Sequence, residues 1–193
     1  HYNVPKHIGT SGHDDPYSWN YTINPRGRDK TDEDRIFSLK PGSFGATLSW
    51  LAADGTDDEQ TDGIAAIETG RLLEQYAADG RSFFLAVGLS KPHLPFYVPQ
   101  QFFDLYPINE IELPPIKEVD LEDIRTPSGK VKFSASNDYL WLREQHQMKQ
   151  AVQAYLAAVS FADACVGKIL EGLRLGPHAG NTIVVIWGDH GWH

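Results

Sequence analysis

The sequence of 193 residues contains a single cysteine, Cys165, and a single methionine. One cysteine excludes an internal disulfide framework. Positive charge is also scarce, because 17 Lys and Arg stand against 26 Asp and Glu and give a formal net charge of −9. This balance argues against non-specific binding to nucleic acid. An anionic substrate would need positive charge concentrated locally, from a metal ion or a few placed cations.

Long hydrophobic runs are missing as well. No stretch approaches the roughly 18 uninterrupted apolar residues that a membrane span requires, so no membrane segment is predicted. Internal repeats and low-complexity tracts are absent too. The sequence is nevertheless 41% hydrophobic and 11% aromatic, which is enough apolar material to bury a core. It corresponds to one ordinary domain or to a generous part of a larger one.

Two parts of the chain show no regular periodicity. Residues 1–56 are rich in Gly, Pro, Asp, Asn and aromatics, and they are predicted to form an ordered but irregular segment. The proline-rich stretch KPHLPFYVPQQFFDLYP (91–107) is predicted to exclude a regular helix or central strand. Residues 107–135 are predicted to be a loop with several prolines.

Two helices are predicted from apolar residues at steps of three and four. The first begins near a capping box formed by Thr56 and Glu59, and Gly80 stands at its C-cap. The second runs from about residue 145 to 175 and ends at a Gly-Pro pair. Cys165 lies on its apolar face and is predicted to be a core residue rather than a nucleophile.

Each predicted helix is followed by a short, nearly all-apolar run. We name SFFLAVG (82–88) the first apolar segment and NTIVVIW (181–187) the second apolar segment. Runs of this length and composition are typical of strands that are covered on both faces. The order helix, strand, helix, strand predicts an α/β fold with parallel strands.

Polar side chains follow both apolar segments, at the strand ends where ligands collect in parallel sheets. The first segment leads into GLSKPH, which contains Lys91 and His93, and the second leads into GDHGWH, which contains Asp189, His190 and His193. Two predicted strands that independently present such residues indicate a site.

The chemistry of these residues has two interpretations. Asp189 and His190 suit a divalent metal ion, but two neighbouring ligands never complete a coordination shell, and Asp189 could equally cap the next segment. His93 lies between two prolines that stiffen the backbone, which suits a hydrogen-bond donor or a general acid, with the charge of Lys91 beside it. It could equally be an ordinary polar residue at the rim of a loop.

A third group of candidate ligands lies near the start of the chain. His1, His7 and His13 share that stretch with Asp14 and Asp15. A second metal cluster there is conceivable, whereas unpatterned histidines in an exposed loop are usually solvated.

Several of these stretches resemble a known family. GDHG (188–191) after a buried strand resembles the metal-binding motif of the alkaline phosphatase superfamily, and FFLAVGLSKPHLPF (83–96) resembles sulfatases, especially the iduronate 2-sulfatase type. DDPYSW (14–19) and YLAAVSFADACVGKIL (155–170) resemble the same subgroup. The resemblance implies part of an alkaline phosphatase-like sandwich, with a mostly parallel central sheet flanked by helices.

The resemblance also implies roles for individual residues. Asp189 and His190 would bind a single calcium ion that polarises a sulfate ester. His93 would donate a hydrogen bond to a sulfate oxygen, with Lys91 as its neighbour in substrate binding. The implied activity is removal of sulfate from a sulfated sugar or polysaccharide, in a periplasmic, secreted or lysosome-like compartment.

Two histidines at the ends of the sequence match the family pattern less fully. His1 stands where sulfatases have a histidine shortly after a lysine, in a segment like G-K-x-x-H, and would be catalytic. His193 falls in a stretch that faces the substrate and is implied to bind it.

The sequence departs from the family in important places. Sulfatases carry a Cys-x-Pro-x-Arg motif whose cysteine becomes formylglycine, the nucleophile, whereas Cys165 is followed by Val-Gly-Lys. The upstream acidic pair that completes the calcium site and the lysine downstream of GDHG are missing as well. Residues 1–193 are therefore predicted to be an incomplete internal segment of a catalytic domain, inactive alone. Residues 1–56 would be its irregular active-site segment and residues 57–193 an α/β core portion.

Two other functions remain open at this stage. A phosphodiester or phosphonate hydrolase of the same superfamily would also use Asp-His pairs, often with two transition metals. A truncated, non-catalytic binding module would lack the nucleophile altogether.

Overall fold

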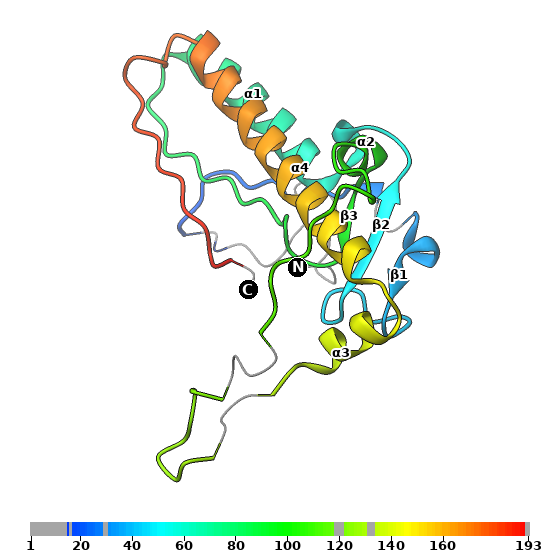
Figure 1. Ribbon diagram of the computed structural model, residues 1–193. Coiled ribbons are helices and arrows are strands. Elements are labelled where there is room, and N and C mark those ends of the chain that lie inside the picture. Colours follow the sequence, from blue (N-terminus) through cyan, green and yellow to red (C-terminus); the bar gives the residue numbers. More distant parts are fainter. Residues whose placement is uncertain (1–14, 16, 29–30, 118–121, 131–133, 192–193) are drawn as a thin grey trace.

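The computed structural model describes residues 15, 17–28, 31–117, 122–130 and 134–191 (Figure 1). The elements in chain order are η2 (Glu33–Arg35), β1 (Phe37–Ser38), β2 (Ser49–Ala53), η3 (Asp57–Glu59), α1 (Thr61–Asp79), β3 (Phe96–Pro99), α2 (Gln100–Asp104), α3 (Asn137–Glu144) and α4 (Met148–Leu175). None of the helices in these ranges is long and apolar enough to cross a lipid bilayer.

The three strands form one small mixed sheet in the order β1-β2-β3. β1 runs antiparallel to β2, with Phe37 opposite Trp50, and β2 runs parallel to β3, from the Trp50–Phe96 pair to the Ala53–Pro99 pair. Helix α4 packs against this sheet and α1 packs against α4, so the fold is α/β as predicted (Figure 1).

Helix α4 packs closely because its inner face carries small side chains. Ala154, Ala157 and Ala158 are completely buried, and Phe161 and Cys165 continue the same face. This face joins the main core cluster with Phe96, Val98 and Phe102 from β3 and α2. The core position predicted for Cys165 is confirmed, and burial raises the pKa of its thiol to about 12, which leaves it an inert thiol.

The predicted helices are confirmed, with changes at their starts. The first begins at Thr61, because the capping box of Thr56 and Glu59 instead caps the short helix η3. Its end is as predicted, at a left-handed Gly80 with φ of 62°. The second is α4, which begins at Met148 because His146 has a left-handed backbone, with φ of 55°, and separates it from α3.

The strands differ more from expectation. β2 falls within residues 1–56, where no period was evident, and β3 falls in the proline-rich stretch. Pro95 and Pro99 flank the apolar residues Phe96–Val98 instead of interrupting them, and β3 lies at the edge of the described sheet, where proline is tolerated. The same stretch also contains the short helix α2, which its prolines were predicted to exclude. All four β3 residues are buried, so burial rather than periodicity specifies this strand.

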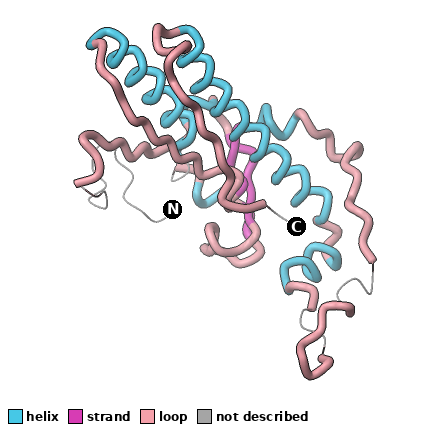
Figure 2. The backbone as a smooth tube through the Cα atoms, turned by 90° about the vertical axis from the view of Figure 1, so that its left-hand side faces the viewer, coloured by secondary structure: helices cyan, strands magenta, loops and turns pink. Residues whose placement is uncertain are grey.

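Neither apolar segment forms a strand in the part of the chain that the structure describes. Each leaves the end of its helix, the first from α1 and the second from α4, and both then run side by side in the same direction (Figures 1 and 2). Phe83 packs against Tyr76 and His178, whereas Phe84 points away and is 85% exposed. The side chains of Phe83 and Phe84 thus alternate as they would in a strand. Within the described ranges, however, no neighbouring strand is hydrogen-bonded to the first apolar segment.

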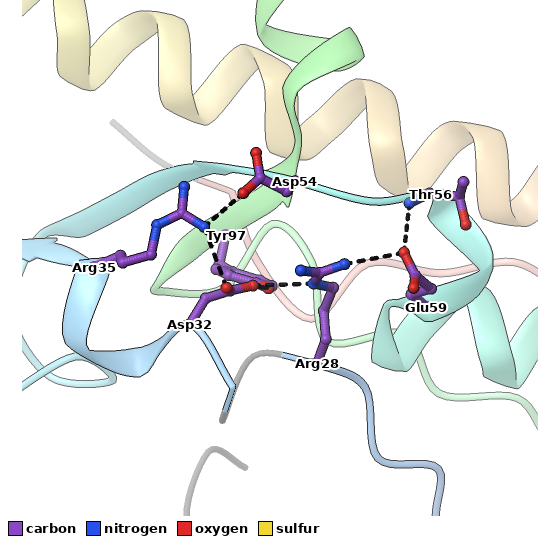
Figure 3. Close-up of polar contacts among 7 residues, drawn as sticks. All are labelled: Arg28, Asp32, Arg35, Asp54, Thr56, Glu59 and Tyr97. Atoms are coloured by element: carbon purple, nitrogen blue, oxygen red, sulfur yellow. Dashed lines mark hydrogen bonds and ion pairs between the residues drawn. The ribbon is translucent and has the colours of Figure 1, made fainter.

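A buried acid anchors the irregular N-terminal segment to the sheet (Figure 3). Asp32 is only 5% exposed, and its carboxylate accepts hydrogen bonds from the Tyr97 hydroxyl at 2.5 Å, the Arg28 Nε at 3.0 Å and the Arg35 Nη1 at 3.3 Å. The Tyr97 bond, followed by Arg28, lowers the pKa of Asp32 below its ordinary value. Burial and the neighbouring carboxylate raise the pKa of Tyr97.

The two arginines extend this arrangement outward. Arg28 also pairs with Glu59 at 3.1 Å, and Arg35 pairs with Asp54 at 2.7 Å (Figure 3). We call these six residues the Asp32 cluster: Arg28, Asp32, Arg35, Asp54, Glu59 and Tyr97. The cluster links the segment before β1 to β3 and to the start of α1.

The Tyr97→Phe variant tests the central bond of the Asp32 cluster. A hydrogen bond to a charged group contributes about 1.5–3 kcal/mol, so we expect the free energy of unfolding at pH 7 to fall by about that amount. The pKa of Asp32 is lower in the folded state, so this contribution is present above the ordinary value of 3.8 and is lost as the pH falls through the folded-state pKa. Urea titrations from pH 7 to well below pH 3.8 should show the difference shrinking at the acid end of the series.

Tyr106→Phe is the matched control for that experiment. Its hydroxyl lies 2.6 Å from the Ser160 hydroxyl, so the lost bond is neutral and should cost about 1 kcal/mol at every pH. A Tyr97→Phe effect that did not change with pH would contradict the charged bond.

The second apolar segment should make the 193-residue chain self-associate. Ile183 is 92% exposed and is followed by exposed Val185 and Trp187, an apolar, strand-prone surface of the kind that pairs with other chains. We expect sedimentation to detect species heavier than the 21.6 kDa monomer. Ile183→Lys with Val185→Lys should reduce them, while Leu175→Lys, at an exposed apolar residue of α4, should not. A purely monomeric unmodified chain would contradict this expectation.

Candidate functional site

Lys91 and His93 lie on one loop between the first apolar segment and β3. We call residues 89–95 the KPH loop. The Lys91 ammonium donates hydrogen bonds to the carbonyl oxygens of Pro95, at 2.7 Å, and His93, at 3.2 Å. The backbone N–H of His93 donates to the carbonyl of Ser90 at 2.9 Å. The loop is thus closed on itself, and it carries a positive charge at its centre.

The ring of His93 has a defined orientation within the loop. Its Nδ1 lies 2.8 Å from the carbonyl oxygen of Leu94. A carbonyl oxygen only accepts hydrogen bonds, so this contact requires the proton on Nδ1. A hydrogen bond from the ring to a ligand would then involve the other ring nitrogen, Nε2.

A buried acid on α1 holds the start of the KPH loop. Asp62 is 2% exposed, and its carboxylate accepts hydrogen bonds from the backbone N–H groups of Ser90 and Lys91 and from the Ser90 hydroxyl, at 2.8–3.0 Å. The sequence analysis did not identify Asp62 as a site residue. The sequence offered one signal for Asp62: it is an acidic residue that directly follows the first residue of a helix and lies next to the apolar stripe of that helix.

Asp189 and His190 follow the second apolar segment and are exposed. Their side chains contact each other, with His190 Nε2 3.7 Å from Asp189 Oδ2, and His190 Nδ1 lies 3.1 Å from the carbonyl oxygen of Gly191. Because the two apolar segments run in the same direction, this pair and the KPH loop follow the same end of both segments (Figures 1 and 2).

The described residues do not by themselves form a calcium site. Calcium takes six to eight ligand atoms, mostly oxygens, whereas Asp189 and His190 offer one carboxylate and one imidazole. Within the described ranges, no group of three or more His, Cys, Asp or Glu residues is placed to hold a metal ion. The pair therefore lacks most of the ligands that a calcium ion requires.

The remaining predicted site residues, His1 and His193, lie outside the described residues. The same holds for His7, His13 and Asp14 of the N-terminal group. Asp15 is described, and it accepts hydrogen bonds from the Ser18 hydroxyl at 2.5 Å and the Tyr17 N–H at 3.0 Å. These local bonds lower its pKa.

A separate hollow of about 380 Å³ lies elsewhere on the surface. Its lining includes Arg35, Phe37 and Trp50 together with glutamines of α2 and α4, and it contains none of the predicted site residues. The candidate site is therefore identified by the chemistry of the loops and not by the shape of the surface.

The chain is similar to known sulfatases over most of its length. The sequence profile of the Sulfatase family matches residues 10–193. A sulfatase of Formosa agariphila is 38% identical over 79% of this chain and 30% of its own length. The iduronate 2-sulfatase of Mus musculus is 33% identical over 95% of this chain and 36% of its own length, and that of Homo sapiens is 31% identical over 93% and 34%.

These matches confirm the resemblance found in the individual stretches of sequence. The chain spans about a third of the length of the curated relatives it matches. Since the family profile extends over nearly all of it, this chain belongs to the sulfatase family.

Proposed function

We propose that the whole protein is a sulfuric ester hydrolase that removes sulfate from a sulfated sugar or polysaccharide. The observation that carries the proposal is the family match over residues 10–193, together with 31–33% identity to two iduronate 2-sulfatases. The KPH loop adds physical support, because it combines a fixed imidazole with a positive charge, and both suit an anionic ester.

In this proposal the chain supplies part of the clamp around the sulfate group. Hydrolysis of the ester needs a placed nucleophile and hydrogen-bond donors aimed at the sulfate oxygens. We assign His93 to donate from Nε2 to a sulfate oxygen, which requires the imidazolium form, because the proton on Nδ1 is already used in the bond to the Leu94 carbonyl. Lys91 adds an ammonium group beside His93, and its hydrogen bonds to the carbonyl oxygens of His93 and Pro95 hold it in the KPH loop.

The nucleophile is proposed to be a formylglycine that lies outside residues 1–193. Cys165 does not supply it, because this thiol is buried in the core and lies outside any Cys-x-Pro-x-Arg motif. The 193 residues alone are accordingly proposed to be inactive. His1 is proposed as a second catalytic histidine and His193 as a contact to the substrate.

Asp189 and His190 are proposed as two ligands of one calcium ion, with the other ligands outside this chain. When bound, calcium would polarise the sulfate ester. The carboxylate and imidazole are chemically suitable ligands, and both side chains are exposed where the second apolar segment ends.

We also propose that both apolar segments are strands of a mostly parallel central sheet in the whole protein, as in an alkaline phosphatase-like sandwich. Their shared direction supports this arrangement (Figure 2). So does the alternating exposure of Phe83 and Phe84.

His93→Ala tests the assignment of the KPH loop. We expect it to lower kcat/KM of the whole protein for an aryl sulfate by about 100-fold or more, the usual cost of losing a donor to developing charge. Sulfate release from the aryl sulfate is compared with phosphate release from the matching aryl phosphate. His146→Asn, in the turn between α3 and α4, is the control and should keep full activity.

Three outcomes would contradict the assignment. The first is unchanged activity in His93→Ala, and the second is a preference for the phosphate ester. The third is sulfate release by purified residues 1–193 that survives His93→Ala, since that chain is proposed to lack the nucleophile.

Calcium removal tests the metal assignment. A chelator should abolish sulfate release by the whole protein, and added calcium should restore it. Asp189→Ala should weaken calcium binding by about 100-fold or more, because it removes a charged ligand and not merely a supporting contact. Elemental analysis gives the metal content, with Asp163→Ala, an exposed carboxylate on α4, as control. Full calcium content in Asp189→Ala, or a transition metal in its place, would overturn the assignment.

A further inference from the structure

We propose that Asp62 is a positioning residue that sets the place of His93 at the candidate site. The inference deepens the proposed function and rests on it for its catalytic consequence. Its structural part, the dependence of the KPH loop on one buried carboxylate, rests on the contacts alone.

The carboxylate of Asp62 uses both oxygens on the KPH loop. Oδ1 accepts from the Ser90 N–H and the Ser90 hydroxyl, both at 3.0 Å, and Oδ2 accepts from the Ser90 N–H at 2.9 Å and the Lys91 N–H at 2.8 Å. The partners are 28 and 29 residues away in sequence. These bonds therefore define tertiary structure and do not merely cap a helix.

Asp62 is not the N-cap residue of α1. That position is held by Gln60, whose side chain makes no capping hydrogen bond, and the Asp62 carboxylate bonds Ser90 and Lys91 instead. An acidic side chain in the first turn would interact favourably with the helix dipole even from an exposed position. Asp62 is instead 2% exposed, and a carboxylate buried to that extent is stable only when several donors compensate for the lost water. The KPH loop supplies those donors.

A short series of bonds connects this carboxylate to the imidazole. Asp62 fixes Ser90, and the Ser90 carbonyl accepts the backbone N–H of His93 at 2.9 Å. On the far side of the loop, Lys91 bonds the Pro95 carbonyl next to β3. The loop is therefore attached at Ser90 to α1 and at Pro95 to the sheet, with His93 between the two attachments.

Loss of the α1 attachment would release one end of the loop. Displacement of a reacting group by about 1 Å can cost about 100-fold in rate even when the change lies far from the chemistry. In the whole protein, Asp62→Ala should therefore lower kcat for an aryl sulfate by about 10- to 100-fold. Asp62→Asn keeps one acceptor oxygen but places an amide donor against a backbone N–H of the loop. Its kcat should therefore lie between those of the unmodified protein and Asp62→Ala.

The first experiment is a double-mutant cycle with His93→Ala in the whole protein. If Asp62 acts through His93, Asp62→Asn should cost little further activity once His93 is gone. A residue that only stabilises the fold would cost the same factor in both backgrounds, and that result would overturn the proposal. Glu74→Gln, an exposed acid on the same helix, is the control for both backgrounds.

The second experiment, hydrogen exchange, needs no activity. In Asp62→Asn and Asp62→Ala, the amides of Ser90, Lys91 and His93 should lose protection by about 10-fold or more, while those of β2 and α4 keep theirs. Unchanged protection in the loop would overturn the proposal, and so would equal losses throughout the protein.

The two experiments also separate this inference from the proposed function. Absence of sulfate release by the unmodified whole protein would contradict the function, while the exchange result would still decide whether Asp62 holds the loop. Should Asp62→Ala fail to fold, Asp62→Asn and Ser90→Ala, which removes only the hydroxyl bond, provide the same comparison.

Discussion

The packing of α4 against β3 and α1 is the contact on which the rest of the structure depends. Ala154, Ala157 and Ala158 let the helix backbone approach the sheet and α1 closely, and Phe161 fills the space beside them. Because α1 and α4 are held together, the segments that leave their ends are held together as well (Figure 2). A core of small residues thus determines where two distant loops carry their polar side chains.

Two buried acids then fix the irregular parts of the chain to this frame. Asp32 attaches the N-terminal segment to β3 through Tyr97 and two arginines, and Asp62 attaches the KPH loop to α1 through backbone N–H groups. In both cases several donors compensate for the desolvation of a carboxylate: Tyr97 and two arginines near in sequence for Asp32, and the distant KPH loop for Asp62. The two differ in what compensates the charge, since cations surround Asp32 whereas neutral dipoles face Asp62.

Sequence patterns predicted what depends on neighbouring residues and missed what depends on distant ones. Both helices, the left-handed Gly80 and the core position of Cys165 follow from local periodicity and capping, and the structure confirms them. The strand β3 has only four residues, too few to show a period, and its prolines obscured it. The role of Asp62 could not be predicted because its partners lie 28 and 29 residues away. The apolar segments were predicted to be buried strands because their composition is typical of buried residues. Burial also requires that another part of the protein cover these residues.

The exposure of the apolar segments and the incompleteness of the proposed calcium site share one physical cause. A central strand needs neighbours on both edges, and a calcium ion needs ligands from several loops, so neither is completed by one stretch of chain. Asp189 and His190 directly follow the second apolar segment, and any strand that pairs with this segment would also restrict where the two ligands lie. Metal binding and strand pairing would then stabilise each other, because an ion that binds only the paired arrangement shifts the equilibrium toward it. The KPH loop differs from the Asp189–His190 part of the candidate site, because Asp62 and β3 hold the loop with contacts that the chain already contains.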